Sequence, residues 1–381
     1  MNRNVKGLVV LLALSLLAMP LFAGGKQEVN NDESDTIHIA LTAPLSGDYA
    51  EYGTNFQRSV EMGIEFINKA GGVLGKDLVL SVGDSKGDPK ESATLAQKWT
   101  SDPTIVAEIG DFTSTCCMAS QPIYDQSEMV QLSPTASHSD FAPGSDWSFG
   151  IVGTQAGEGP FMADFAYNGL GLRTIAVINI NNDWGIDTQK YFSEAFEKLG
   201  GVIIATESYF DGEKDFTAIL TKMKATKPDA LFMAAMYNDG ALISKQRVKL
   251  GWDVVVVGPS SLYSEQLLTL GGDAVEGLYT NVSFFTEDPA EDVQFYVTEF
   301  ESRYGVKPNF HAALAFDAIN ILAAAIEKAG TTDRTAIKEA LAKTTDFKAL
   351  TGSITFTPVG DAVKQYTKVW ITDGKFKVYN D

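Results

Sequence analysis

Short apolar runs alternate with longer amphipathic segments over most of this sequence. The short runs are rich in β-branched residues, as in TIHIAL at 36–41, and this is typical of strands buried in a sheet. The longer segments repeat apolar residues every three or four positions, as in NFQRSVEMGIEFINKAGG at 55–72, and this is typical of helices that cover a sheet. Regular alternation of the two predicts an α/β fold with parallel sheets.

The alternation occurs in two successive sets, which predict two doubly wound parallel-sheet lobes. In the first set we expect strands at 36–41, 77–84, 104–111 and 129–133, with helices at 55–72, 88–102 and 120–127. In the second set we expect strands at 174–180, 202–210, 229–235 and 254–259, with helices at 158–171, 187–201, 215–228 and 239–251.

The carboxyl-terminal part departs from this rhythm. Three helices are predicted in succession, at 288–305, 312–330 and 333–344. Residues 352–379 then alternate at period two, and TDGK at 372–375 is a hairpin turn signal. A second turn is expected at PVGD, 358–361.

The amino terminus has the pattern of a secretory signal. Arg3 and Lys6 precede an apolar run, and LFA before Gly24 offers a small residue for cleavage. We therefore expect a signal peptide at 1–23, a polar disordered leader at 24–35 and a periplasmic or extracytoplasmic protein. No cysteine stands near position 24, so a lipoprotein is not expected.

Composition narrows the function classes. Acidic residues outnumber basic ones by 49 to 30, and the formal net charge of −19 disfavours nucleic acid and anionic membrane as partners. His38, His138 and His311 are in no metal-ligand spacing, so no metal site is expected. No nucleophile elbow, P-loop or dinucleotide-binding motif is present, so no cofactor is expected and the sequence does not predict an enzyme.

The two cysteines, Cys116 and Cys117, follow a run of three hydroxyl residues in GDFTSTCCMASQP at 110–122. Helix periodicity turns Cys117 toward the packed side, where a thiol behaves as a small apolar group. We expect structural thiols or a passive disulfide between the neighbours. The hydroxyls are the better candidates for ligand contact.

Four predicted loops at the carboxyl ends of strands are rich in hydroxyl, aromatic and glycine residues, and this is where open α/β sheets bind ligands. Hydroxyls and free amides at a helix start suit a small anion such as a carboxylate. Tyr52 and Trp184 lie in two of these loops and could enclose an apolar group. The loops are TAPLSGDYAEYGTN, GDFTSTCCMAS, SPTASHSD and NINNDWGID.

Several segments resemble the substrate-binding proteins of branched-chain amino acid ABC importers, which have the type I periplasmic binding fold. The segments are APLSGDYAEYG, INKAGGVLGKDLVL, GDSKGDP and GDFTSTCCMASQPIY, and the resemblance covers roughly 36–381. It implies two lobes joined by three crossovers, near 153, 283 and 356, with the ligand clamped between them. Lobe 1 is then 36–153 with 284–356, and lobe 2 is 154–283 with 357–381.

The resemblance also implies the ligand contacts. The family's carboxylate-binding serine falls on Ser114, and the next contacts fall on Thr135 and Ser137. Aromatic contacts fall on Tyr52 and Trp184. Tyr237 is the candidate for a second lobe-2 tyrosine, although a strict count places Met236 there.

One departure from the family concerns the ligand amine. Relatives hold it with an acidic residue just after a Gly-Pro pair, but Gly258-Pro259 is followed here by Ser260 and Ser261. Three aspartates in neighbouring loops could supply the charge instead: Asp111, Asp183 and Asp239. Otherwise the ligand lacks an amine, as an amide, urea or a simple carboxylate does.

The resemblance implies a monomeric solute-binding protein that delivers a small polar ligand, such as a branched-chain or other apolar amino acid, to an ABC permease. A sensory protein that reports to a membrane receptor is the alternative. A secreted enzyme would need a catalytic constellation that the sequence does not contain.

Overall fold

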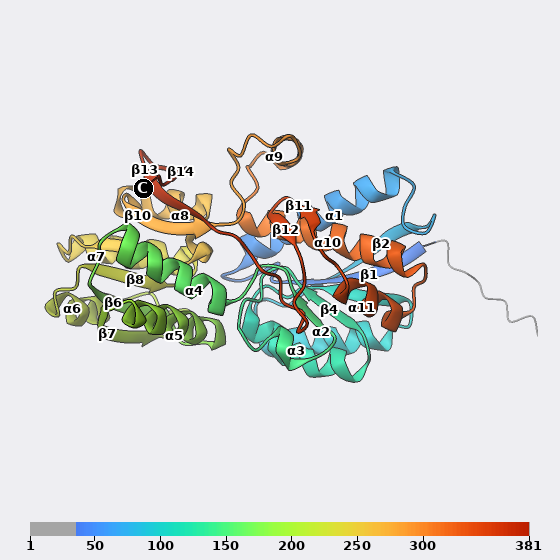
Figure 1. Ribbon diagram of the computed structural model, residues 1–381, viewed down its shortest axis with the longest axis horizontal. Helices are drawn as coiled ribbons and strands as arrows, with labels where there is room; N and C mark the ends of the chain where they lie inside the picture. Colours follow the sequence, from blue (N-terminus) through green and yellow to red (C-terminus); the bar gives the residue numbers. More distant parts are fainter. Residues whose placement is uncertain (1–35, 381) are drawn as a thin grey trace, which may run out of the picture. The chain divides into compact units, whose positions relative to one another are not determined.

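The computed structural model describes residues 36–380. The predicted signal peptide and leader, 1–35, lie outside the described residues. The chain forms two main sheets with helices around them, which confirms the predicted α/β class (Figure 1).

The first sheet has five parallel strands in the order β2-β1-β3-β4-β5. This is a doubly wound order, in which the chain reverses direction across the sheet beside β1. Four strands match the prediction, and the short β5 was missed. Their bounds are β1 Thr36–Ala43, β2 Asp77–Asp84, β3 Ile105–Ile109, β4 Val130–Ser133 and β5 Ser148–Gly150.

Helices lie on both sides of this sheet (Figure 1). α1 packs on α10 and α10 on α11, while α2 packs on α3. The predicted carboxyl-terminal helices therefore complete the first sheet's cover. α10 is long and apolar enough to cross a membrane by length and composition, but 78% of its apolar window is buried in the core. The bounds are α1 Ala50–Lys69, α2 Pro89–Ser101, α3 Ser114–Gln126, α9 Glu291–Tyr304, α10 Phe310–Ala329 and α11 Arg334–Ala342.

The second sheet has seven strands in the order β14-β13-β10-β9-β8-β6-β7. Strands β6 to β10 pair in parallel, whereas β13 pairs antiparallel with β10 and with β14. The β13–β14 hairpin turns at the predicted TDGK. The bounds are β6 Thr174–Ile180, β7 Val202–Tyr209, β8 Ala230–Ala234, β9 Val255–Val257, β10 Leu278–Val282, β13 Thr367–Thr372 and β14 Lys375–Val378.

The helices that accompany the second sheet follow the predicted order, with the short α8 in addition. α4 packs on α5, and α7 packs on α6 and α8. Their bounds are α4 Gln155–Asp164, extended by a π-helical turn at Phe165–Gly169, α5 Asp183–Lys198, α6 Thr217–Ala225, α7 Tyr237–Lys249 and α8 Glu265–Gly271.

The chain passes between the sheets after β5, after β10 and before β13. Before the last passage, β11 Phe347–Ala349 pairs with β12 Gly352–Ile354. The amide of Gly150 donates to the carbonyl of Gly360, and the amide of Ala362 donates to the carbonyl of Gly150. Residues just beyond the predicted crossing at 356 thus still bond to the first sheet, and the chain joins the second sheet only at β13.

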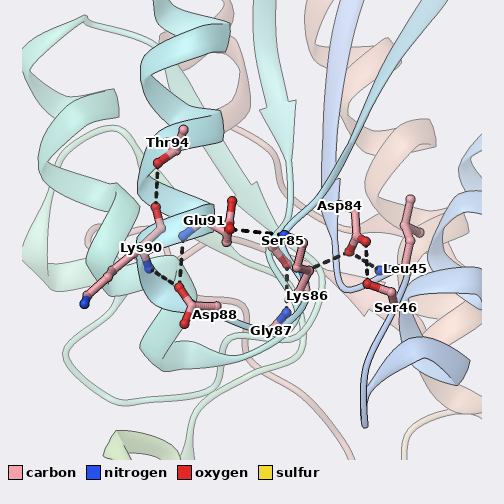
Figure 2. A network of polar contacts seen from close by, with 10 residues as sticks. All are labelled: Leu45, Ser46, Asp84, Ser85, Lys86, Gly87, Asp88, Lys90, Glu91 and Thr94. Atoms are coloured by element: carbon pink, nitrogen blue, oxygen red, sulfur yellow. Dashed lines mark hydrogen bonds and ion pairs between the residues drawn. The ribbon is translucent and has the colours of Figure 1, made fainter.

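A polar network ties together the loops after β1 and β2 (Figure 2). The carboxylate of Asp84 accepts hydrogen bonds from the amide of Leu45 at 2.8 Å and the hydroxyl of Ser46 at 2.6 Å. Asp88 caps α2 as the sequence predicts, because its side chain accepts from the amides of Lys90 and Glu91. Much of the GDSKGDP segment therefore has a structural role, because it holds the loop that follows β1.

Candidate functional site

A small cavity lies between loops that follow strands of the two sheets. The volume available in it to water-sized molecules is about 30 Å³. Six of its lining residues carry hydroxyls, five are apolar or aromatic, and two are titratable. They are Thr113, Ser114, Thr135, Ser137, Ser260 and Ser261; Phe112, Val152, Trp184, Met236 and Phe310; and Glu158 and His311. Four predicted contacts, Ser114, Thr135, Ser137 and Trp184, are brought together here.

The start of α3 forms one wall. Thr113 is the N-cap, and its hydroxyl accepts from the amide of Cys116 at 3.1 Å. Ser114 is the first residue of the helix, and its Oγ accepts from the amide of His138 at 3.2 Å. The first amides of a helix have no partner within it, and the helix dipole makes this end partly positive. This wall is suited to an anionic group.

The loop after β4 continues the wall. The hydroxyl of Thr135 donates to the carbonyl of Phe112 at 2.7 Å. The Oγ of Ser137 accepts from Nε2 of Gln155 at 2.9 Å, and the Gln155 amide donates to the Ser137 carbonyl at 2.8 Å. Ser137 therefore joins the first-sheet loop to the start of α4.

Glu158 of α4 supplies the cavity's only carboxylate among the lining residues. The residue is only 5% exposed. Its Oε1 accepts from the amide of Ser260 at 2.7 Å and from Nδ2 of Asn281 at 2.8 Å. Its Oε2 accepts from Nε2 of Gln155 at 2.9 Å. Three hydrogen bonds offset the cost of burying this carboxylate and fix its direction.

A glycine allows α4 to approach α5 closely enough to place Glu158. A Cβ on Gly159 would lie 2.8 Å from the backbone and Cβ of Tyr191 on α5. Any larger residue would push α4 away from α5, and Glu158 would move with it.

Tyr52 and Tyr237 do not line the cavity; they pack behind it. The ring of Tyr52 stacks on Phe112 at 4.2 Å between centroids and meets Tyr237 at 5.0 Å. The Tyr52 hydroxyl donates to the carbonyl of Ser261 and accepts from the amide of Tyr237, both at 3.3 Å. Met236, the strict-count alternative to Tyr237, is the residue that reaches the wall.

The three aspartates expected near the ligand amine are elsewhere. Asp183 is exposed at the start of α5. Asp239 is buried against the hydroxyl of Tyr209 at 3.1 Å, and burial raises its pKa to about 6. Asp111 is buried within the loop after β3, where burial raises its pKa, and its side chain accepts from the backbone amide of Phe112. None of the three lines the cavity.

His311, the second residue of α10, faces the cavity from the first lobe's helical cover. Burial lowers the pKa of its imidazole to about 3, so the ring is neutral at physiological pH. Within the described residues, its Nδ1 has no hydrogen-bond partner.

Both cysteines are buried and free, outside the lining of the cavity. Burial raises the pKa of both thiols. The Sγ of Cys117 accepts from the amide of Asp111 at 3.1 Å and packs with Ala136 and Phe141. These positions agree with the predicted structural role, with free thiols in place of a disulfide.

The sequence reasoning missed Glu158, His311, Phe112 and Phe310. Glu158 looks like an ordinary acidic residue of a helix's first turns, where the dipole favours a negative charge. His311 could have been noticed from the sequence, because it is a polar residue at the start of the most apolar helix of the described chain.

A sequence model described as periplasmic binding protein matches residues 36–375. The leucine-, isoleucine-, valine-, threonine- and alanine-binding protein of Pseudomonas aeruginosa is 28% identical over 330 residues, which cover 86% of this chain and 87% of that protein.

Solved structures of two binding proteins are similar to this chain. The leucine binding protein LivK from Thermotoga maritima has a TM-score of 0.84 and 26% identity, covering 90% of this chain and 98% of its own. The substrate binding protein LivJ from Streptococcus pneumoniae, solved with isoleucine, also has a TM-score of 0.84 and 26% identity, covering 90% and 99%. These likenesses confirm the expected type I periplasmic binding fold.

Proposed function

We propose that this chain, which belongs to the periplasmic binding protein family and is the solute-binding protein of an ABC importer, takes an α-amino acid as its ligand. The ligand's carboxylate lies at the start of α3 among the hydroxyls of Ser114, Thr135 and Ser137. Its ammonium group lies against the carboxylate of Glu158. Amino acid binding by the relatives supports this ligand class.

The buried carboxylate of Glu158 is the observation that carries the proposal. It lines the same cavity as the α3 start, but it comes from the helix after the first passage between sheets. A zwitterion satisfies both ends at once. An amide, urea or a simple carboxylate would leave the charge of Glu158 without a cation in a dry site, which is costly.

Glu158 also explains the serines after Gly258-Pro259. The amide of Ser260 donates to Glu158, so the loop orients a carboxylate that comes from another element. Helix α4 thus supplies a carboxylate, that of Glu158, beside the loop that follows Gly258-Pro259. The cavity therefore keeps a negative charge although serines stand where the family has an acidic residue.

Calorimetric titration with the proteinogenic amino acids, each paired with its deaminated carboxylic acid, tests the proposal. The wild type should prefer the amino acid. Glu158→Gln should weaken amino acid binding by about 10- to 150-fold, the equivalent of a lost hydrogen bond to a charged group. It should also abolish the preference over the deaminated analogue.

Asp183→Asn is the matched control, because Asp183 is exposed and does not line the cavity. Like Glu158→Gln, it removes one carboxylate from the helices around the second sheet, and it should leave ligand affinity unchanged. Tighter binding of urea, an amide or a deaminated acid than of any amino acid would refute the proposal.

We further propose that the two lobes, one built on the first sheet and one on the second, separate to admit the ligand. The cavity is small, at about 30 Å³, so we expect the ligand to enter when the lobes move apart. The backbone amide of Ser139, in the loop after β4, donates to the carboxylate of Asp187 on α5 at 2.9 Å, and this contact between the lobes must break when they separate. Small-angle scattering should show a smaller radius of gyration with ligand, and an unchanged profile at saturation would contradict closure.

The family supports an extracytoplasmic location and an ABC permease as partner. We propose that the mature protein begins at or near Gly24, carries no lipid and acts as a monomer. Intact-mass analysis of the exported protein tests the first two points, and retention of 1–23 or an attached acyl chain would refute them.

A further inference from the structure

We propose that His311 reads the side chain of the ligand, and that this protein selects an amino acid with a neutral hydrogen-bonding side chain, a hydroxyl or a carboxamide. The inference rests on the proposed function, since it assumes that the cavity holds an amino acid. It adds the chemical class of that amino acid.

Position is the first support. His311 follows Phe310 at the head of α10, where Asn309 caps the helix by accepting from the amide of Ala312 at 2.8 Å. The residue is 5% exposed, and it lines the cavity. The capped helix end therefore holds the imidazole at the cavity wall.

Three aromatic rings fix the imidazole's orientation. Its centroid lies 4.8 Å from that of Tyr52 in an edge contact, 5.6 Å from Phe112 and 5.3 Å from Phe310. A ring confined this way has little freedom to turn toward a protein partner. Phe112 and Phe310 also line the cavity, so the surroundings of His311 there are largely apolar.

An unmet hydrogen-bonding capacity is the second support. Nδ1 of His311 has no partner among residues 36–380. Leaving a buried polar group unpaired is unfavourable, and such groups in native proteins nearly always have a hydrogen-bond partner. A purely apolar ligand side chain would leave the imidazole unsatisfied in the closed state.

The neutral state of the His311 imidazole indicates which class of ligand side chain it can bind. Burial lowers the pKa of His311 to about 3, so the ring offers one donor and one acceptor and carries no charge. A hydroxyl or a carboxamide can both donate and accept, and therefore matches either edge of the ring. A charged side chain would enter an apolar corner with no opposite charge from His311.

Isosteric ligand pairs test the inference. L-threonine and L-valine differ only by a hydroxyl in place of a methyl group, and L-asparagine and L-leucine differ similarly by a carboxamide in place of an isopropyl group. Titration of the full mature protein should show tighter binding of the polar member of at least one pair, by about 5- to 150-fold.

His311→Phe keeps a ring of similar size and the aromatic contacts but removes the nitrogens. It should abolish or reverse the preference, whereas His311→Gln should retain part of it. His38→Phe is the control: His38 lies on β1, bonded to Thr36 at 3.1 Å and outside the cavity lining, and the preference should not change.

The outcomes separate the two proposals. If amino acids bind but valine and leucine match or exceed threonine and asparagine in the wild type, the inference on His311 is wrong and the proposed function stands. If no proteinogenic amino acid binds, the proposed function itself fails. The wild-type ratios decide the inference even if His311→Phe does not fold.

Discussion

The carboxylate of Glu158 accepts a 2.7 Å hydrogen bond from the backbone amide of Ser260. Ser260 directly follows Pro259, in the loop after β9, while Glu158 lies about a hundred residues earlier in the chain on α4. The side chain of Asn281 on β10 donates to the same oxygen at 2.8 Å. One oxygen of the buried carboxylate is thus held by two elements that belong to the second sheet.

Removing the Asn281 donor should loosen Glu158 without touching the ligand, because Asn281 does not line the cavity. We expect Asn281→Ala to lower the free energy of unfolding by about 1.5–3 kcal/mol, as for a hydrogen bond to a charged group. Ligand affinity should fall roughly tenfold, or about 1.4 kcal/mol. Urea unfolding and titration measure the two effects. Asn168→Ala, which removes an exposed amide bonded to Asp164, is the control and should change neither.

Substitutions at Thr113 and Ser114 should distinguish the role of helix capping from the role of ligand binding. Thr113 is the N-cap of α3, so Thr113→Ala should lower the free energy of unfolding by about 1 kcal/mol. Ser114 follows the cap, and Ser114→Ala should weaken ligand binding by about 10- to 150-fold through loss of a hydroxyl beside a charged group. Melting curves and titration on both variants check this. Unchanged affinity in Ser114→Ala, with the stability loss there instead, would contradict it.

The pH dependence of stability should report the buried imidazole. The pKa of His311 is lowered from 6.5 to about 3 by burial, so below pH 6.5 the unfolded chain takes up a proton that the folded chain does not. Its contribution is full above that pH and is lost as pH falls. Between pH 7 and 5 the wild type should lose about 2 kcal/mol relative to His311→Phe. Urea unfolding at both pH values measures the difference, and parallel pH profiles would refute it.

The cysteine pair should affect stability alone. Replacing Cys116 and Cys117 together by alanine should cost about 1–3 kcal/mol through lost packing. Ligand affinity should stay within about twofold, since neither thiol lines the cavity. Because burial raises both thiol pKa values, a thiol reagent at pH 8 should react only as the protein unfolds. Rapid reaction in the native state, or a collapse of affinity in the double variant, would show that the thiols face the ligand.

The order of elements was predictable because hydrophobic periodicity is local. TIHIAL became β1, the cap at Asp88 began α2, and TDGK turned the β13–β14 hairpin. Short elements such as β5 and α8 were missed because three to seven residues carry too little periodic signal.

The candidate site was predictable where it lies on loops that directly follow strands. Ser114, Thr135, Ser137 and Trp184 reach one cavity because the carboxyl ends of parallel strands share an edge. Tyr52 and Tyr237 were predicted to contact the ligand, but they lie behind the cavity wall. The sequence indicates which segment a residue belongs to, but the distance of its side chain from a cavity depends on the packing of the whole fold.

Local pattern determined which residues this chain buries and in which elements, because burial follows a period of two or 3.6 that the sequence carries directly. Only the tertiary structure decided that the carboxylate of Glu158 meets the amide of Ser260 and that His311 stands at the same cavity. Those meetings depend on strand order and on helix packing as close as that at Gly159. Contacts between residues so far apart in the chain come from the summed packing of the whole fold, and no short stretch of sequence encodes them.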